Sequence, residues 1–71
     1  MSYEKNKFEE EIKKLQERIN YYKGEIKYRQ AFLQMNPRDR ESYRLIKDRE
    51  REIVILDNQI KSIEEKLKRL A

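Results

Sequence analysis

The feature that most limits the fold is a repeat of apolar residues at alternating steps of three and four, on both sides of one break at Asn36-Pro37. The first half repeats Phe8, Ile12, Leu15, Ile19, Tyr22, Ile26 and Leu33, and the second repeats Ile46, Ile53, Leu56, Ile60, Ile63, Leu67 and Leu70. Such spacing is typical of the seam between two packed helices. We therefore predict an all-α fold, an antiparallel two-helix coiled-coil hairpin.

The break predicts where the helices end. We expect one helix over about residues 3–35, a turn over about 35–38 and a second helix over about 37–70. Asn36 suits the position that caps a helix, Pro37 suits the first helical position, and Asp39 suits the positive helix end. A fold axis between Pro37 and Arg38 also gives consistent layers, which include Ile19 opposite Leu56, Leu15 opposite Ile60, and Tyr22 opposite Ile53.

Composition agrees with one small helical unit. The 71 residues include one glycine, one proline, no cysteine and 45% charged side chains, which leaves apolar residues for a seam but not for a globular core. The lack of cysteine excludes disulfides and thiolate metal sites. No apolar run of about 18 residues is present, and no apolar segment after Met1 resembles a secretory signal. We expect a soluble, cytoplasmic protein without a membrane partner.

Residue types argue against catalysis. The chain has neither histidine nor cysteine, and a two-helix rod offers no cleft in which a carboxylate, lysine, tyrosine or serine would act. Runs such as Glu9–Glu11 and Glu64–Glu65 place consecutive carboxylates in different directions around a helix, so we read them as solvated rather than as metal ligands. The sequence predicts no enzyme activity, no cofactor, no metal and no small-molecule substrate.

A second set of apolar residues lies outside the seam. Heptad positions c and g, which flank the seam on one side, hold Tyr21, Tyr28, Phe32, Met35, Leu45 and Ile55. We call these six residues the apolar face. Exposed apolar patches of this kind usually mark interfaces, and the simplest partner is a second copy, which would give a homodimeric four-helix bundle. The alternative is that the tyrosines are ordinary amphipathic surface residues.

The seam also contains charge. Arg29 and Arg49 fall at seam positions, where an unpaired charge is costly. Glu25 lies four residues before Arg29, and Glu52 lies three residues after Arg49, so both carboxylates are within reach. This polar layer is expected to fix register and orientation, while an arginine pocket for an anionic ligand is the functional alternative.

Positive charge is concentrated around the turn. The whole net charge of +4 belongs to residues 27–51, which contain six of the eight arginines. Arg40, Arg44, Lys47 and Arg51 are spaced to form one stripe on the outside of the second helix, with Arg38 nearby in the turn. We call these four helical residues the basic stripe. It would suit phosphates or an acidic protein, whereas a solvated helix surface is the simpler reading.

These features predict a binding protein. The favoured function is a protein-protein interaction module, or a small regulator or inhibitor of a larger complex, acting through a self-associating hairpin. The alternatives are an RNA- or DNA-binding dimer that uses the basic stripe, and a structural spacer or scaffold component.

Gly24 costs about 1 kcal/mol relative to alanine in mid-helix and marks either a thin spot or a close neighbour.

Overall fold

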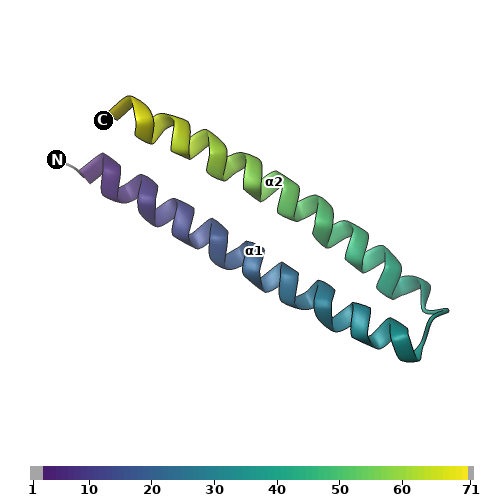
Figure 1. Ribbon diagram of the computed structural model, residues 1–71. Helices are drawn as coiled ribbons and strands as arrows, with labels where there is room; N and C mark the ends of the chain where they lie inside the picture. The colour runs from purple at the N-terminus through teal and green to yellow at the C-terminus, as the bar shows by residue number, and fades with distance from the viewer. Residues whose placement is uncertain (1–2, 71) are drawn as a thin grey trace.

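Two long antiparallel helices make up the part of the chain that the computed structural model describes, residues 3–70. Helix α1 spans Tyr3–Met35 and helix α2 spans Arg40–Leu70. Figure 1 shows the two helices side by side, joined by a short turn at one end, with both chain termini at the other. The rod measures 53 × 14 × 12 Å. The predicted all-α hairpin is confirmed, whereas its assembly into a four-helix bundle stays a prediction.

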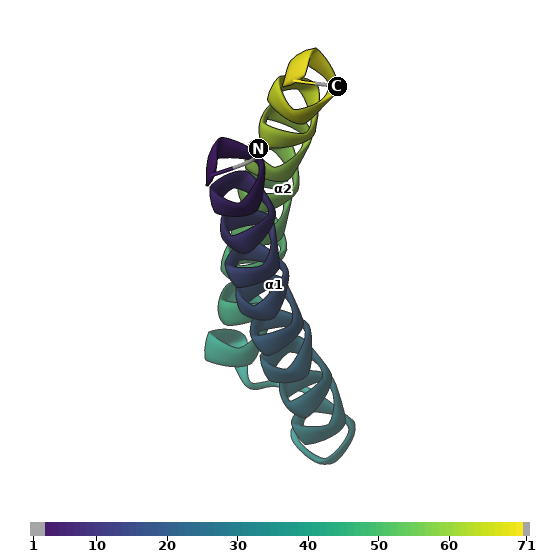
Figure 2. The same ribbon diagram turned by 90° about the vertical axis from the view of Figure 1, so that its left-hand side faces the viewer.

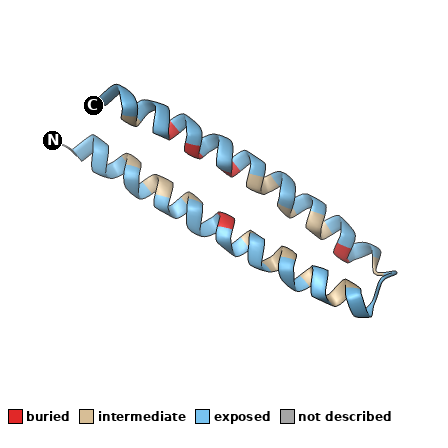
Figure 3. Ribbon diagram, viewed as in Figure 1, coloured by how far each residue is buried: buried red, intermediate tan, exposed pale blue. Residues whose placement is uncertain are grey.

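The seam follows the predicted apolar repeat. Ile19, Leu56 and Ile60 form the buried cluster, and Ile63 is the remaining buried apolar residue among those described. Partly buried apolar residues around the cluster are Ile12, Leu15, Tyr22 and Ile53. Figure 3 shows the buried positions on the sides of α1 and α2 that face each other, and Figure 2 shows the helices crossing at a shallow angle. These residues are the ones that the predicted layers place together.

The turn differs from the prediction. The second helix begins at Arg40 rather than near residue 37, and Pro37 and Arg38 lie in a turn outside both helices. The backbone N–H of Asp39 donates to the carbonyl of Asn36 over 3.1 Å, which closes a four-residue turn with Pro37 at its second position. Proline fits that position of a turn as well as it fits the start of a helix, because both need the same φ angle.

Asn36 therefore does not cap α2. Its backbone N–H donates to the carbonyl of Phe32 over 2.9 Å, and its side-chain Nδ2 donates to the same carbonyl over 3.4 Å, so it completes the end of α1. Asp39 directly precedes α2 instead. Its carboxylate accepts a 2.6 Å hydrogen bond from the hydroxyl of Ser42, three residues later. The hydroxyl of Tyr43 also donates to the carbonyl of Pro37 over 3.1 Å, which ties the first turn of α2 to the connection.

No described helix is both long enough and apolar enough to cross a membrane.

Candidate interaction surfaces

An ion pair links the two helices in the turn-proximal half of the seam. The Nε of Arg49 in α2 donates to Oε1 of Glu25 in α1 over 2.7 Å, and both side chains are about two-thirds buried. The guanidinium also lies 5.1 Å from the ring centre of Tyr22. The hydrogen bond that Arg49 donates to Glu25 raises the pKa of Arg49 above its ordinary value. Arg49 is therefore paired with a carboxylate across the seam.

The second seam arginine uses a different partner from the one predicted. Arg29 donates through Nη1 to the hydroxyl of Ser42 over 3.3 Å, and the same hydroxyl donates onward to Asp39. Glu25 is thus used by Arg49 across the seam rather than by Arg29 one turn away, because the antiparallel register brings Glu25 opposite Arg49. Glu52 forms no ion pair with any described residue. The four residues of the predicted polar layer therefore do not form one unit.

Ser42 is the site residue that sequence reasoning missed. It is fully buried, with 0% of its surface exposed, and it is the one buried polar residue among those described. Its hydroxyl accepts a hydrogen bond from the guanidinium of Arg29 and donates one to the carboxylate of Asp39. The available signal was its seam position, because Ser42 lies four residues before Ile46 and seven before Arg49 in the repeat.

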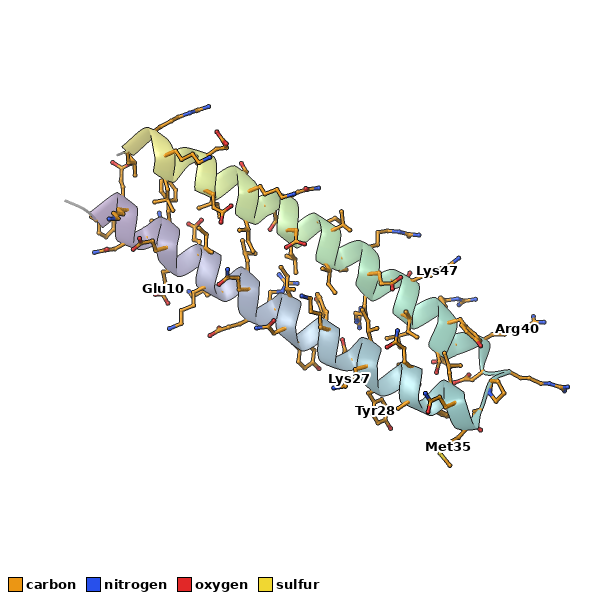
Figure 4. All side chains as sticks on the ribbon, viewed as in Figure 1. Glu10, Lys27, Tyr28, Met35, Arg40 and Lys47 are labelled. Carbon is orange, nitrogen blue, oxygen red and sulfur yellow. The ribbon has the colours of Figure 1, made fainter. Side chains whose placement is uncertain are left out.

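Four members of the apolar face are well exposed in the hairpin. The exposed fractions are 66% for Tyr21, 70% for Tyr28, 84% for Met35 and 46% for Ile55. The other two members, Phe32 and Leu45, are half-buried against the seam. Figure 4 shows Tyr28 and Met35 pointing away from α2. The hairpin therefore does not cover this apolar surface itself.

A shallow groove lies on the apolar face. It is lined by Asn20, Tyr21, Gly24, Glu25, Tyr28, Arg29 and Leu45. Tyr21 and Tyr28 are two helical turns apart with Gly24 between them, and Leu45 belongs to the opposite helix. The groove thus extends from the two tyrosines of α1 to Leu45 of α2, and it is least enclosed at Gly24, which has no side chain.

A second groove lies nearer the chain termini and has a different character. Its lining consists of Glu11, Lys14, Leu15, Arg18, Gln59, Ser62, Ile63 and Lys66. Next to it, Arg18 donates through Nη2 to the hydroxyl of Tyr22 over 3.1 Å, and this bond raises the pKa of Arg18. Half of the residues that line this second groove have long charged side chains, which flex and are readily solvated.

The basic stripe is free of ion pairs within the described part of the chain. The two ion pairs found in residues 3–70 are Arg49–Glu25 and Lys68–Glu65, so none involves Arg40, Arg44, Lys47 or Arg51. All four side chains are exposed, as is Arg38 in the turn. In Figure 4, Arg40 and Lys47 extend outward from α2. The stripe is therefore open to an acidic partner.

Nothing in the described residues gathers three or more aspartate or glutamate side chains in a way that could hold a metal ion. The chain matches no protein-family model, and no curated protein or solved structure matches it.

Proposed function

We propose that this protein is a non-enzymatic protein-protein interaction module, a small regulator or inhibitor of a larger complex. Its hairpins associate through the apolar face into a homodimeric four-helix bundle. The observation that carries the proposal is the exposure of Tyr21, Tyr28, Met35 and Ile55 next to the half-buried Phe32 and Leu45. Exposed apolar groups that gather on one side of a small protein commonly mark a binding surface.

The size of the hairpin supports a second copy as the partner. A single chain buries four apolar side chains among those described, which is a thin core for a protein of this length. A standard interface covers about 800 Å² per partner. One long side of a rod measuring 53 by 14 Å offers an area of that order, while the whole described surface is 6050 Å². Dimerisation would therefore add an interface of standard size to the thin core of each chain.

Sedimentation equilibrium of the purified protein tests the self-association. We expect the mass of a dimer for the natural sequence and a shift toward monomer for Tyr28→Glu, because the added charge would have to be buried. Tyr28 is 70% exposed, so this substitution leaves the hairpin seam intact. Gln30→Glu is a matched control, because Gln30 is exposed and lies on the opposite flank of α1.

The outcomes separate the possible assemblies. A natural protein that is monomeric at all concentrations would overturn the proposed dimer. Equal masses for natural protein and Tyr28→Glu would show that another surface holds the copies together. A mass that keeps rising beyond a dimer would identify a structural scaffold instead.

Nucleic-acid binding is the second candidate, and the unpaired basic stripe favours it. Three guanidinium groups and one ammonium group along one helix face can follow a phosphate backbone, and such binding weakens steeply as salt concentration rises. Fluorescence anisotropy with generic duplex and single-stranded oligonucleotides, measured from low to high salt, tests this candidate. Absence of binding at low ionic strength would remove it. Salt-sensitive binding that Arg44→Glu abolishes would favour it over the protein-binding function.

A further inference from the structure

Gly24 has no role within the hairpin that would favour glycine. It lies in the middle of the 33-residue helix α1, and its backbone has no positive φ angle. A Cβ atom added at this position would meet nothing within 4 Å. Glycine in a helix interior is destabilising relative to alanine because it loses more conformational freedom on folding. The hairpin alone would therefore be more stable with alanine here.

Large and small residues alternate along this side of α1. Tyr21, Tyr28 and Met35 are large and exposed, while Gly24 and Ala31 between them are small and exposed. The spacing of three and four puts all five in one row along the helix. Projecting side chains and recesses therefore occur on the same surface. A two-fold symmetric interface requires this property, because each copy must supply both the projection and the recess.

The charged residues of the groove are already occupied within the chain. Glu25 accepts from Arg49 over 2.7 Å, and Arg29 donates to Ser42 over 3.3 Å. The other residues that line the groove, and that a partner could contact, are uncharged: Asn20, Tyr21, Gly24, Tyr28 and Leu45. Such a lining suits an uncharged, aromatic or apolar occupant. The tyrosine side of a second α1 helix has that chemistry.

We infer that Gly24 is the contact point at which the α1 helices of two copies cross, antiparallel, in the homodimer. The inference rests on the proposed self-association and adds its geometry. A two-fold axis beside Gly24 brings the two backbones close where no side chain separates them. It also places Tyr21 of each copy opposite Tyr28 of the other. Aromatic pairs of this kind favour offset or edge-to-face packing.

Two substitutions test the crossing on the 71-residue chain. Gly24→Leu should raise the dissociation constant of the dimer at least tenfold in sedimentation experiments, because its side chain would occupy the place of the partner's backbone. Far-UV circular dichroism should show equal or greater helix content, since leucine favours a helix more than glycine does. The matched control is Gln30→Leu, which adds an exposed leucine to the other flank of α1 and should leave the dissociation constant within twofold.

A disulfide experiment measures the contact directly. The natural chain contains no cysteine, so Gly24→Cys introduces a single thiol. Two such thiols beside a two-fold axis can oxidise to a disulfide, which needs Cα atoms within about 7 Å. We expect rapid covalent dimer formation for Gly24→Cys under mild oxidation and slow formation for Gln30→Cys.

The inference and the proposed function fail in different ways. A natural protein that forms no dimer overturns both. A dimer that Tyr28→Glu disrupts, but that Gly24→Leu leaves unchanged in affinity and Gly24→Cys does not cross-link, overturns the crossing and retains the apolar face. Loss of affinity with preserved helix content in Gly24→Leu, together with the Gly24→Cys cross-link, supports the crossing.

Discussion

The two halves of the hairpin are held together by different interactions. In the half nearer the termini, Ile19, Leu56, Ile60 and Ile63 are buried between the helices. In the half nearer the turn, the buried residue is Ser42, apolar seam residues such as Ile46 are only half-buried, and hydrogen bonds join the two helices. The turn-proximal half also contains the exposed Tyr28 and Met35 and the whole net positive charge.

This difference shows which half of the molecule has apolar surface available for a partner. Burial of an apolar side chain contributes about 1.5–3 kcal/mol, whereas a net intramolecular hydrogen bond contributes about 0.5–1.5 kcal/mol. The terminal half therefore supplies most of the stability of the hairpin. The turn-proximal half is organised by specific polar contacts and presents its large apolar groups outward, which is the arrangement expected of a recognition region.

The largest expected effect is the loss of a terminal-half core residue. Leu56 is 3% exposed, and Leu56→Ala should destabilise the fold by about 2–5 kcal/mol through lost burial and a cavity. A small helical protein has little more stability than that, so much of the chain should unfold at room temperature. Urea unfolding followed by circular dichroism measures it. Ile46→Ala, at a half-buried seam position near the turn, should cost clearly less. Equal costs would remove the contrast between the halves.

An intermediate effect is expected at the buried hydroxyl. Ser42→Ala removes the buried hydroxyl that links Arg29 to Asp39, and the cost should be about 1–3 kcal/mol because these two half-buried groups each lose a partner. Ser62→Ala is the control, since Ser62 is exposed and should change stability by less than about 0.5 kcal/mol. Thermal unfolding of the two variants compares them. A Ser42→Ala variant as stable as the control would mean that the polar network does not hold the turn-proximal half.

The smallest effect, and one of opposite sign, is expected on the basic stripe. Lys47 lies three and four residues from Arg44 and Arg51 and three from Glu50, so its repulsive pairs outnumber its attractive one, and each pair is worth about 0.2–0.5 kcal/mol. Lys47→Gln should therefore stabilise the protein slightly at low salt, and the gain should fade in about 1 M salt. Lys61→Gln should do the reverse, because Asp57, Glu64 and Glu65 surround Lys61 at helical spacing. A destabilised Lys47→Gln would show that the stripe is balanced by its acidic neighbours.

The apolar repeat predicted the hairpin and its layers well, because the seam needs an apolar residue every three or four positions and few other folds share that spacing. The start of α2 was harder to predict. Asn36 and Asp39 are both good caps, and Pro37 is compatible with a helix start and with a turn. Which residue precedes α2 depends on how the two helices pack against each other. In the structure Ser42 bonds to Arg29 of α1 and to Asp39, and this arrangement favours Asp39 as the residue before α2.

The polar partners could be predicted only as a set of candidates. Glu25 can reach Arg29 along its own helix or Arg49 across the seam, and the long arginine side chain decides between them by its rotamer and by the nearby ring of Tyr22. Exposure of Tyr21, Tyr28, Met35 and Ile55 followed from their heptad position c, whereas Phe32 and Leu45, at position g next to the seam, are half-buried. The partner that covers the apolar face could not be predicted, because a heptad position indicates the direction of a side chain and not the molecule that it contacts.

The placement of both chain ends at one end of the rod has a practical consequence. Entry at Tyr3 and exit at Leu70 lie on the same side, while the turn lies at the far end of the 53 Å length. The hairpin can therefore be inserted into a surface loop of a host protein without separating the two ends of that loop. It would then project from the host and present Arg38 and its neighbours far from the host surface. Fluorophores attached near the two ends would likewise report by energy transfer when the helices separate.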